Sequence, residues 1–161
     1  MTEIVFTPIG TVRSQFRDPK DMPIQPVGAR GIRGTIELDP AYAAGLKDLD
    51  GFSRIIVLYH FHRSSSYSLE VVPFLDKTSR GVFATRAPRR PNAIGISILK
   101  LVSVDGATLV VEDVDILDGT PVLDIKPYVP AFDAYPDERA GWLTTTSGAA
   151  GTVRSDDRFC I

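Results

Sequence analysis

The stretch Ile94–Leu117, IGISILKLVSVDGATLVVEDVDIL, decides the fold class because it predicts a β-hairpin. Residues 94–104 and 108–117 are two apolar runs, and the Asp105-Gly106 pair between them is a strong turn signal for antiparallel strands. The apolar residues of the first run change parity part of the way along it, which predicts a β-bulge near Ile98.

Further strands are expected on both sides of this hairpin, at residues 4–12, 34–38, 54–62, 81–85 and 122–128. The run 54–62, RIIVLYHFH, is almost continuously apolar, which indicates burial on both faces. One short helix is expected after Asp39, because Asp39 suits an N-cap and Pro40 suits the first helical position. Closely spaced strands with one short helix predict a mainly β protein, an antiparallel, barrel-like single domain.

The chain divides into a barrel region and a tail. Residues 1–130 are expected to form the barrel domain, because the regular apolar pattern ends near Val129. Residues 131–161 are expected to form a C-terminal extension that either wraps around the barrel or is mobile. A length of 161 residues suits one domain with a core of its own.

The composition limits the classes of function and the compartment. The formal net charge is −2, so any nucleic-acid contact must depend on a local basic patch. The single cysteine, Cys160, excludes an intrachain disulfide and a cysteine-based metal cluster. The sequence has neither a signal peptide nor an apolar run long enough to span a membrane, so a cytoplasmic protein is expected.

Such a patch is formed by Arg80, Arg86, Arg89 and Arg90, and the last three of these lie in the segment Gly81–Gly95, GVFATRAPRRPNAIG. Its residues 86–92, RAPRRPN, form a loop in which two prolines restrict the backbone and three arginines supply planar donor groups. A stiff loop of this kind suits a planar or anionic ligand. The competing interpretation is a solvated turn whose arginines only aid solubility.

Three further segments are candidates for chemistry. The turn Asp118-Gly119-Thr120-Pro121 follows an acidic strand and offers a carboxylate and backbone amides, although it also suits a simple turn. The proline-spaced loop 17–27 is rigid enough to close over a site. His60 and His62 share one strand face and could bind a metal with Asp118 or Asp124, but no third ligand is marked by spacing, so a pair of hydrogen-bonded histidines is favoured and no metal is expected.

Four motifs together resemble the TsaA-like family of TrmO-type tRNA methyltransferases. They are Asp50-Gly51-Phe52-Ser53, Tyr59-His60-Phe61-His62, the segment Gly81–Gly95 and the segment Asp118–Tyr128. The resemblance covers most of residues 4–130, and it is to a short form, because the bacterial enzyme carries an additional C-terminal domain.

The resemblance implies a β-barrel homodimer that uses S-adenosylmethionine to methylate N6 of threonylcarbamoyl-adenosine 37 in tRNA. The cofactor contacts that it implies are Ile24, Gln25, Pro26, His62, Arg63, Arg86, Ile96, Leu117, Asp118, Gly119 and Thr120. Asp118 and Tyr128 are the predicted catalytic residues that orient the amine, and the predicted RNA contacts are Arg89, Arg90, Asn92 and Lys126.

Two alternatives stay open at this point. A barrel that holds S-adenosylmethionine or a nucleotide for regulation, and catalyses nothing, fits the near-neutral charge and the missing domain. A metal-dependent hydrolase built on His60 and His62 is the weaker alternative.

Overall fold

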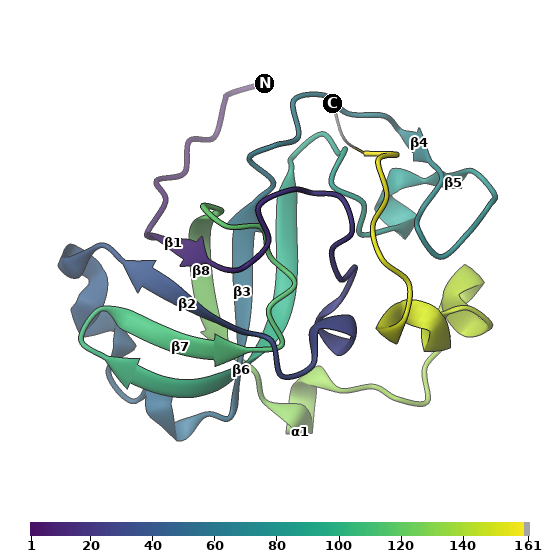
Figure 1. Cartoon of the computed structure of the whole chain (residues 1–161). Coiled ribbons are helices and arrows are strands. Elements are labelled where there is room, and N and C mark those ends of the chain that lie inside the picture. The colour runs from purple at the N-terminus through teal and green to yellow at the C-terminus, as the bar shows by residue number, and fades with distance from the viewer. Residues whose placement is uncertain (160–161) are drawn as a thin grey trace.

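The computed structural model describes residues 1–159, and its centre is a closed, six-stranded barrel (Figure 1). The strands are β1 (Gly10–Arg13), β2 (Arg33–Leu38), β3 (Arg54–His60), β6 (Ile94–Asp105), β7 (Thr108–Glu112) and β8 (Pro121–Pro127). Their order is β1-β2-β7-β6-β3-β8, and β8 pairs with β1 to close the barrel. Every pair is antiparallel. The predicted fold class is confirmed.

The predicted hairpin forms β6 and β7, with its turn at Asp105-Gly106. Gly106 has a φ of +58°, which a glycine adopts without steric cost. The bulge lies between Leu101 and Ser103 rather than near Ile98, so the prediction of its position was wrong. Up to Leu101 the odd-numbered residues of β6 face the core. The isoleucines at even positions therefore face away from it.

Strand β7 ends at Glu112, five residues before the predicted end of the run 108–117. Asp113 takes the left-handed conformation, with a φ of +67°, and this stops the extended backbone. Its carboxylate accepts a hydrogen bond from Gly31 N (2.9 Å) and pairs with Arg54 (3.1 Å). The chain can therefore leave the barrel at this point and run toward the site described below.

Strand β3 is buried on one face rather than on both. Ile55, Val57 and Tyr59 are in the core, while the residues between them are only half-buried. A closed barrel has one inward face per strand, so continuous hydrophobicity in β3 cannot mean equal burial. The core contains the buried residues Val12, Ile36, Leu38, Leu46, Ile55, Val57, Tyr59, Leu99, Leu101, Leu109, Val111, Val114, Ile116 and Val122.

The predicted helix is present, but as a 3-10 helix, η2 (Pro40–Leu46). Asp39 caps it as predicted, because its side chain accepts a hydrogen bond from Ala41 N (2.9 Å). The other short helices among the described residues are η1 (Pro26–Ala29), η3 (Leu49–Gly51), η4 (Val82–Ala84), η5 (Gly141–Thr144), η6 (Ser147–Gly151) and the α-helix α1 (Pro130–Asp133).

Two predicted strands are shorter than expected. Of the run 81–85 only Gly81 belongs to a strand, β5 (Arg80–Gly81), which pairs with β4 (Glu70–Val71) outside the barrel before η4 begins. In the run 4–12 the strand starts only at Gly10. Before it, Ile9 N donates to Val122 O of β8 (2.8 Å) without being part of a strand, and Ile4 and Val5 are largely exposed.

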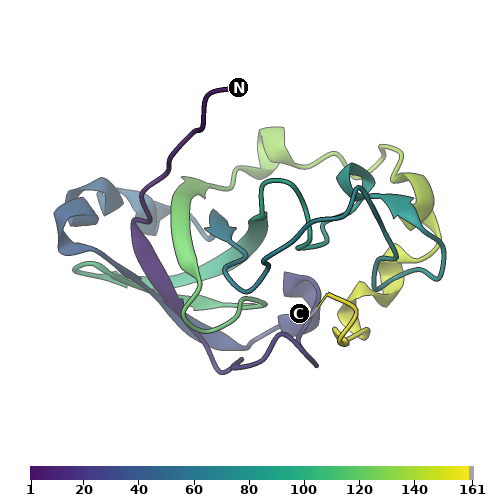
Figure 2. The same ribbon diagram turned by 90° about the horizontal axis from the view of Figure 1, so that it is seen from above.

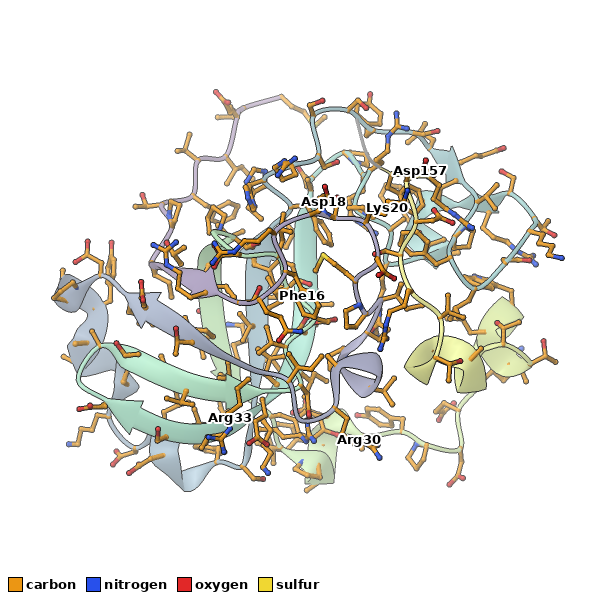
Figure 3. All side chains as sticks on the ribbon, in the orientation of Figure 1. Phe16, Asp18, Lys20, Arg30, Arg33 and Asp157 are labelled. Carbon is orange, nitrogen blue, oxygen red and sulfur yellow. The ribbon has the colours of Figure 1, made fainter. Side chains whose placement is uncertain are left out.

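The segment after β8 runs along the side of the molecule opposite the barrel, next to β4 and β5 (Figure 2). It returns to the loop 14–25, where Asp21 N donates to Ser155 O and Ser155 N donates to Met22 O, both at 2.8 Å. Figure 3 labels Lys20 on that loop and Asp157 on the C-terminal segment beside it. Among the described residues no helix is long and apolar enough to cross a membrane.

Candidate functional site

A cavity of about 680 Å³ lies where β3 ends and β6 begins. One side is the barrel, with Tyr59 and Phe61 from the end of β3 and Ile94 and Ile96 from the outward face of β6. The other sides are the proline-spaced loop, the loop 86–92 (the arginine loop), residues 115–117 with Thr120, and the C-terminal segment. Segments from most of the chain therefore meet at one hollow of ligand size.

The arginine loop is held rigid by internal hydrogen bonds. Arg90 Nη1 donates to Thr85 O (2.9 Å) and to Ala87 O (3.2 Å), which fastens the two ends of the loop together. Thr85 Oγ1 donates to Val82 O (2.8 Å), and Ala87 packs in a small second core with Val71 and Val82. The stiffness that the prolines predict is therefore reinforced by one of the three arginines.

Arg86 joins the arginine loop to the proline-spaced loop. Its Nη1 donates a hydrogen bond of 3.0 Å to Gln25 Oε1. Both side chains line the cavity, and both are among the predicted cofactor contacts. The structure thus brings two loops that are far apart in the sequence to one edge of the cavity.

Most of the predicted cofactor contacts line the cavity: Ile24, Gln25, His62, Arg63, Arg86, Ile96, Leu117 and Thr120. Pro26, Asp118 and Gly119 do not line it. Burial lowers the pKa of His62, with smaller effects of the same sign from the charges of Arg63 and His60, which favours the neutral imidazole.

The two predicted catalytic residues lie elsewhere. Asp118 Oδ1 accepts a hydrogen bond from Ser14 N (3.0 Å), and its Oδ2 pairs with Arg17. Asp118 lines a separate hollow of about 400 Å³ with Arg13 and Arg33. Tyr128 follows β8, where its backbone N donates to Arg54 O (3.1 Å), and it does not line the cavity.

The predicted RNA contacts divide into two groups. Arg90 is occupied within its own loop and lines the cavity, so it is not a free surface cation. Arg89 Nη2 donates to Ser66 Oγ (2.9 Å), Asn92 is exposed, and Lys126 forms an exposed ion pair with Asp124 (2.7 Å). These three lie outside the set of residues that line the cavity.

A polar chain in the cavity wall was not predicted from the sequence. Tyr59 Oη and Ser97 Oγ are 3.1 Å apart, and Ser97 Oγ donates to Asp115 Oδ1 (2.6 Å). Burial raises the pKa of Asp115 to about 7, against the opposing effects of the Ser97 hydrogen bond and the Arg86 charge. In the sequence, only Ser97 could have indicated this series of hydrogen bonds, because it is a polar residue at a position of β6 that faces the core.

Gly95 leaves space for the Tyr59 ring in this series of hydrogen bonds. A Cβ at Gly95 would overlap the ring of Tyr59 and would lie only 2.9 Å from the ring of Phe61. The two rings also meet edge to face, with centroids 5.4 Å apart. A glycine is therefore needed here so that the ring of Tyr59 can lie against β6 and its hydroxyl can reach Ser97.

The C-terminal segment supplies part of the cavity wall. Trp142 Nε1 donates to Ala84 O (2.8 Å), and the guanidinium of Arg80 lies 5.5 Å from the centre of the indole ring. Phe159 packs edge to face on Phe74, with centroids 5.1 Å apart. Trp142 and Phe159 both line the cavity, so the site extends beyond residue 130.

The histidine pair does not assemble a metal site in the described part of the chain. Within residues 1–159, no group of three or more His, Cys, Asp and Glu side chains is placed to hold a metal ion. Cys160 lies outside the described residues.

Comparison with known proteins shows the family. Residues 11–134 match the sequence profile described as the tRNA-methyltransferase O N-terminal domain. A probable S-adenosyl-L-methionine-binding protein of Pyrococcus abyssi is 51% identical over 97% of this chain and 85% of its own length. The tRNA (adenine(37)-N6)-methyltransferase of Escherichia coli is 34% identical over 95% of this chain and 69% of its own length.

The fold agrees with solved structures. A crystal structure of TrmO from Pseudomonas aeruginosa superposes with a TM-score of 0.74 at 40% identity, over 88% of this chain. The aligned part is 63% of that TrmO chain, so this chain spans less than two thirds of it. On the profile match, the identities and the shared barrel, the chain belongs to the tRNA-methyltransferase O N-terminal domain family.

Proposed function

We propose that this protein is an S-adenosylmethionine-dependent methyltransferase that modifies N6 of adenosine 37 in tRNA, with the threonylcarbamoyl form as its substrate. One observation carries the proposal: a single cavity gathers the proline-spaced loop, the end of β3, the arginine loop and the turn after Asp115. These are the segments that the family resemblance assigns to the cofactor. The names of the relatives support both the cofactor and the reaction.

The residues of the cavity fit the chemistry of the cofactor. Its volume lies within the range of roughly 300–1,000 Å³ of small-molecule sites. Ile96 and Leu117 offer apolar surface for an adenosine, while Arg63 and Arg86 offer cations for an amino-acid carboxylate. Ile24, Gln25, His62 and Thr120 complete the set that would hold the group.

When bound, S-adenosylmethionine supplies a methyl group that its positive sulfonium has already activated. The chain then has to orient the acceptor nitrogen, keep water out and accept one proton. Stiffness of the arginine loop, through Arg90 and the prolines, serves orientation. We assign Asp118 a supporting role, because its bonds to Ser14 and Arg17 hold the turn that carries Leu117 and Thr120.

We infer that tRNA binds over the exposed side of the arginine loop. Arg89, Asn92 and Lys126 are the predicted contacts that do not line the cavity, and Arg89 and Lys126 would meet phosphates. We also propose a cytoplasmic location, which a tRNA substrate supports. The family resemblance supports a homodimer, and light scattering of the purified protein would test it.

A direct assay tests the function. The purified protein would be incubated with methyl-labelled S-adenosylmethionine and with two threonine tRNAs, one carrying threonylcarbamoyl-adenosine and one carrying plain adenosine at position 37. Mass spectrometry of the nucleosides should find the methyl group on the threonylcarbamoyl nucleoside alone. Transfer to the plain adenosine alone would overturn the proposed substrate, and no transfer to either would overturn the proposed reaction.

A binding module without catalysis is the second candidate, because the Pyrococcus relative is named only as a binding protein. Calorimetry would separate the two. Tight S-adenosylmethionine binding without methyl transfer to either tRNA is the result that this candidate requires.

A further inference from the structure

A methyl transfer to an N–H nitrogen releases one proton, so the cavity needs a proton acceptor. Within residues 1–159, two carboxylates line it, Asp115 and Asp156. Arg158 donates to both oxygens of Asp156, and these hydrogen bonds hold its pKa below the usual range, which makes Asp156 a weak base. Asp115 has no such cation bonded to it and belongs to a chain of hydroxyl groups instead.

The hydrogen bonds between Tyr59, Ser97 and Asp115 all donate in the same direction. The Ser97 hydroxyl has one proton, and it donates that proton to Asp115 Oδ1 at 2.6 Å. The contact between Ser97 Oγ and Tyr59 Oη must then use the Tyr59 proton, so Tyr59 donates to Ser97. Both hydroxyl groups therefore point their protons toward Asp115. A carboxylate accepts through two oxygens, so the Ser97 bond orients Asp115 without exhausting its capacity to accept.

Burial makes this orientation precise. Ser97 is 2% exposed and Tyr59 is 6% exposed, and both belong to paired barrel strands. Asp115 lies in the segment that follows β7, between Val114 and Ile116, which are both buried in the core. A rigid sheet thus fixes the position of a carboxylate at the cavity wall.

We propose that Asp115 accepts the proton that the target adenine N6 loses, with Ser97 and Tyr59 as the residues that position its carboxylate. This rests on the proposed function. The N6 lone pair forms the new N–C bond, and the methyl–sulfur bonding pair stays on sulfur, which becomes a neutral thioether. The N6 proton goes to Asp115 and from there to water.

The charges around Asp115 suit that role. Burial raises its pKa to about 7, while the Ser97 hydrogen bond and the Arg86 charge lower it. A base is most effective when its pKa is near the working pH. Groups that face it from the neighbouring elements are Tyr59 of β3, Ser97 of β6 and Arg86 of the arginine loop, and His62, Arg63, Arg90 and Asp156 complete the ionisable part of the cavity wall.

The test is the pH profile of single-turnover methyl transfer to tRNA, measured from about pH 5.5 to 9. The wild-type rate should rise through about pH 7 as Asp115 loses its proton. Asp115→Asn should lower the rate by about 10²–10⁴-fold, the usual contribution of a positioned base, and keep cofactor binding. Ser97→Ala should move the rise to higher pH, because the carboxylate loses a hydrogen bond that favours its charged form.

Two variants complete the comparison. Asp105→Asn removes the same charge at the exposed hairpin turn, where asparagine suits the backbone, and it should match wild type. His62→Gln removes the imidazole of the cavity wall, whose pKa is lowered by burial, and should leave the position of the pH rise unchanged.

The outcomes distinguish a failure of the proposed function from a failure of the proposed role of Asp115. If wild type transfers no methyl group, the proposed function and this proposal both fall. If wild type is active but Asp115→Asn stays within about threefold of it, Asp115 is not the acceptor. An unshifted profile in Ser97→Ala, or loss of the pH-dependent rise in His62→Gln, also overturns the proposal. If Asp115→Asn loses cofactor binding, the Ser97→Ala profile decides.

Discussion

Arg86 donates a hydrogen bond of 3.0 Å to Gln25, and this bond joins the arginine loop to the proline-spaced loop across 61 residues of sequence. Both side chains line the cavity, so the bond fixes the distance between two of its walls. An exposed hydrogen bond of this kind is worth little for folding alone. Its value lies in holding the two loops ready for a ligand.

Removing this bond should weaken cofactor binding. We expect Arg86→Ala to lower the affinity for S-adenosylmethionine by about tenfold, because a charge-assisted hydrogen bond is lost along with a cation of the cavity. Gln25→Ala should have a smaller effect. Calorimetry on both variants and on the double variant measures the coupling, which should be about 0.5–1.5 kcal/mol. Simple additivity of the two effects would contradict this reading of the bond.

The three arginines should separate into three roles. Arg90→Ala removes two hydrogen bonds inside the loop, so we expect a loss of about 1–3 kcal/mol in the free energy of unfolding. Arg89→Ala removes one hydrogen bond, to Ser66, so it should cost less stability than Arg90→Ala, and it should weaken tRNA binding, with a salt dependence that is flatter by about one unit of slope. Denaturant unfolding and tRNA titration at several salt concentrations check these expectations.

The control for this comparison is Arg30→Ala, which removes an exposed arginine that does not line the cavity. It should change neither stability nor the affinity for tRNA. If Arg89→Ala destabilises the protein as much as Arg90→Ala does, the assignment of roles is wrong.

The charged form of Asp115 should destabilise the folded protein at neutral pH. Its pKa is raised by burial to about 7, so between about pH 4 and pH 7 the folded protein holds a proton that the unfolded chain releases. Stability therefore falls as the pH rises through this window. Asp115→Asn does not titrate, so its advantage over wild type should grow by about 2–4 kcal/mol from pH 4 to pH 8.

Denaturant unfolding at the two pH values measures this difference, and comparison of each protein with itself cancels other effects of the substitution. Asp105→Asn, at the exposed hairpin turn, should follow the wild-type pH dependence. Equal pH dependence of wild type and Asp115→Asn would show that Asp115 titrates as an ordinary surface carboxylate.

Trp142 offers a direct signal for the cavity, because it is the single tryptophan of the chain and lines the cavity wall. We expect its fluorescence to change on addition of S-adenosylmethionine. Trp142→Ala should lower cofactor affinity by about three- to tenfold, since it removes apolar surface and the bond to Ala84 O. Trp142→Phe keeps an aromatic ring and isolates the contribution of that hydrogen bond. Fluorescence that does not respond to a ligand whose binding calorimetry detects would place the ligand away from Trp142.

Local patterns predicted the barrel well where they depended on neighbouring residues. The Asp105-Gly106 turn, strand β2 and the Asp39 cap follow from short-range rules, and each is present. The strand ends were predicted less well, since Asp113 stops β7 through contacts with Gly31 and Arg54, which lie far from it in the sequence.

The residues of the site were also predicted in part. Arg86 and Gln25 were identified from the motifs of the family. The role of Arg90 was not, because the sequence does not distinguish an arginine that binds its own loop from one that faces RNA. The position of the Asp118 side chain was also not predicted. Its turn borders the site, but the carboxylate is occupied by Ser14 and Arg17 on another side.

By itself, then, the sequence determined an antiparallel barrel, a stiff arginine loop and the family, because alternation, turn residues and prolines act over a few neighbouring positions. Only the tertiary structure decided that Tyr59, Ser97 and Asp115 form one chain of hydrogen bonds. These residues are separated by 38 and 18 positions and meet because β3 pairs with β6 while the chain turns back after β7. Burial at that meeting point, rather than any local pattern, raises the pKa of Asp115.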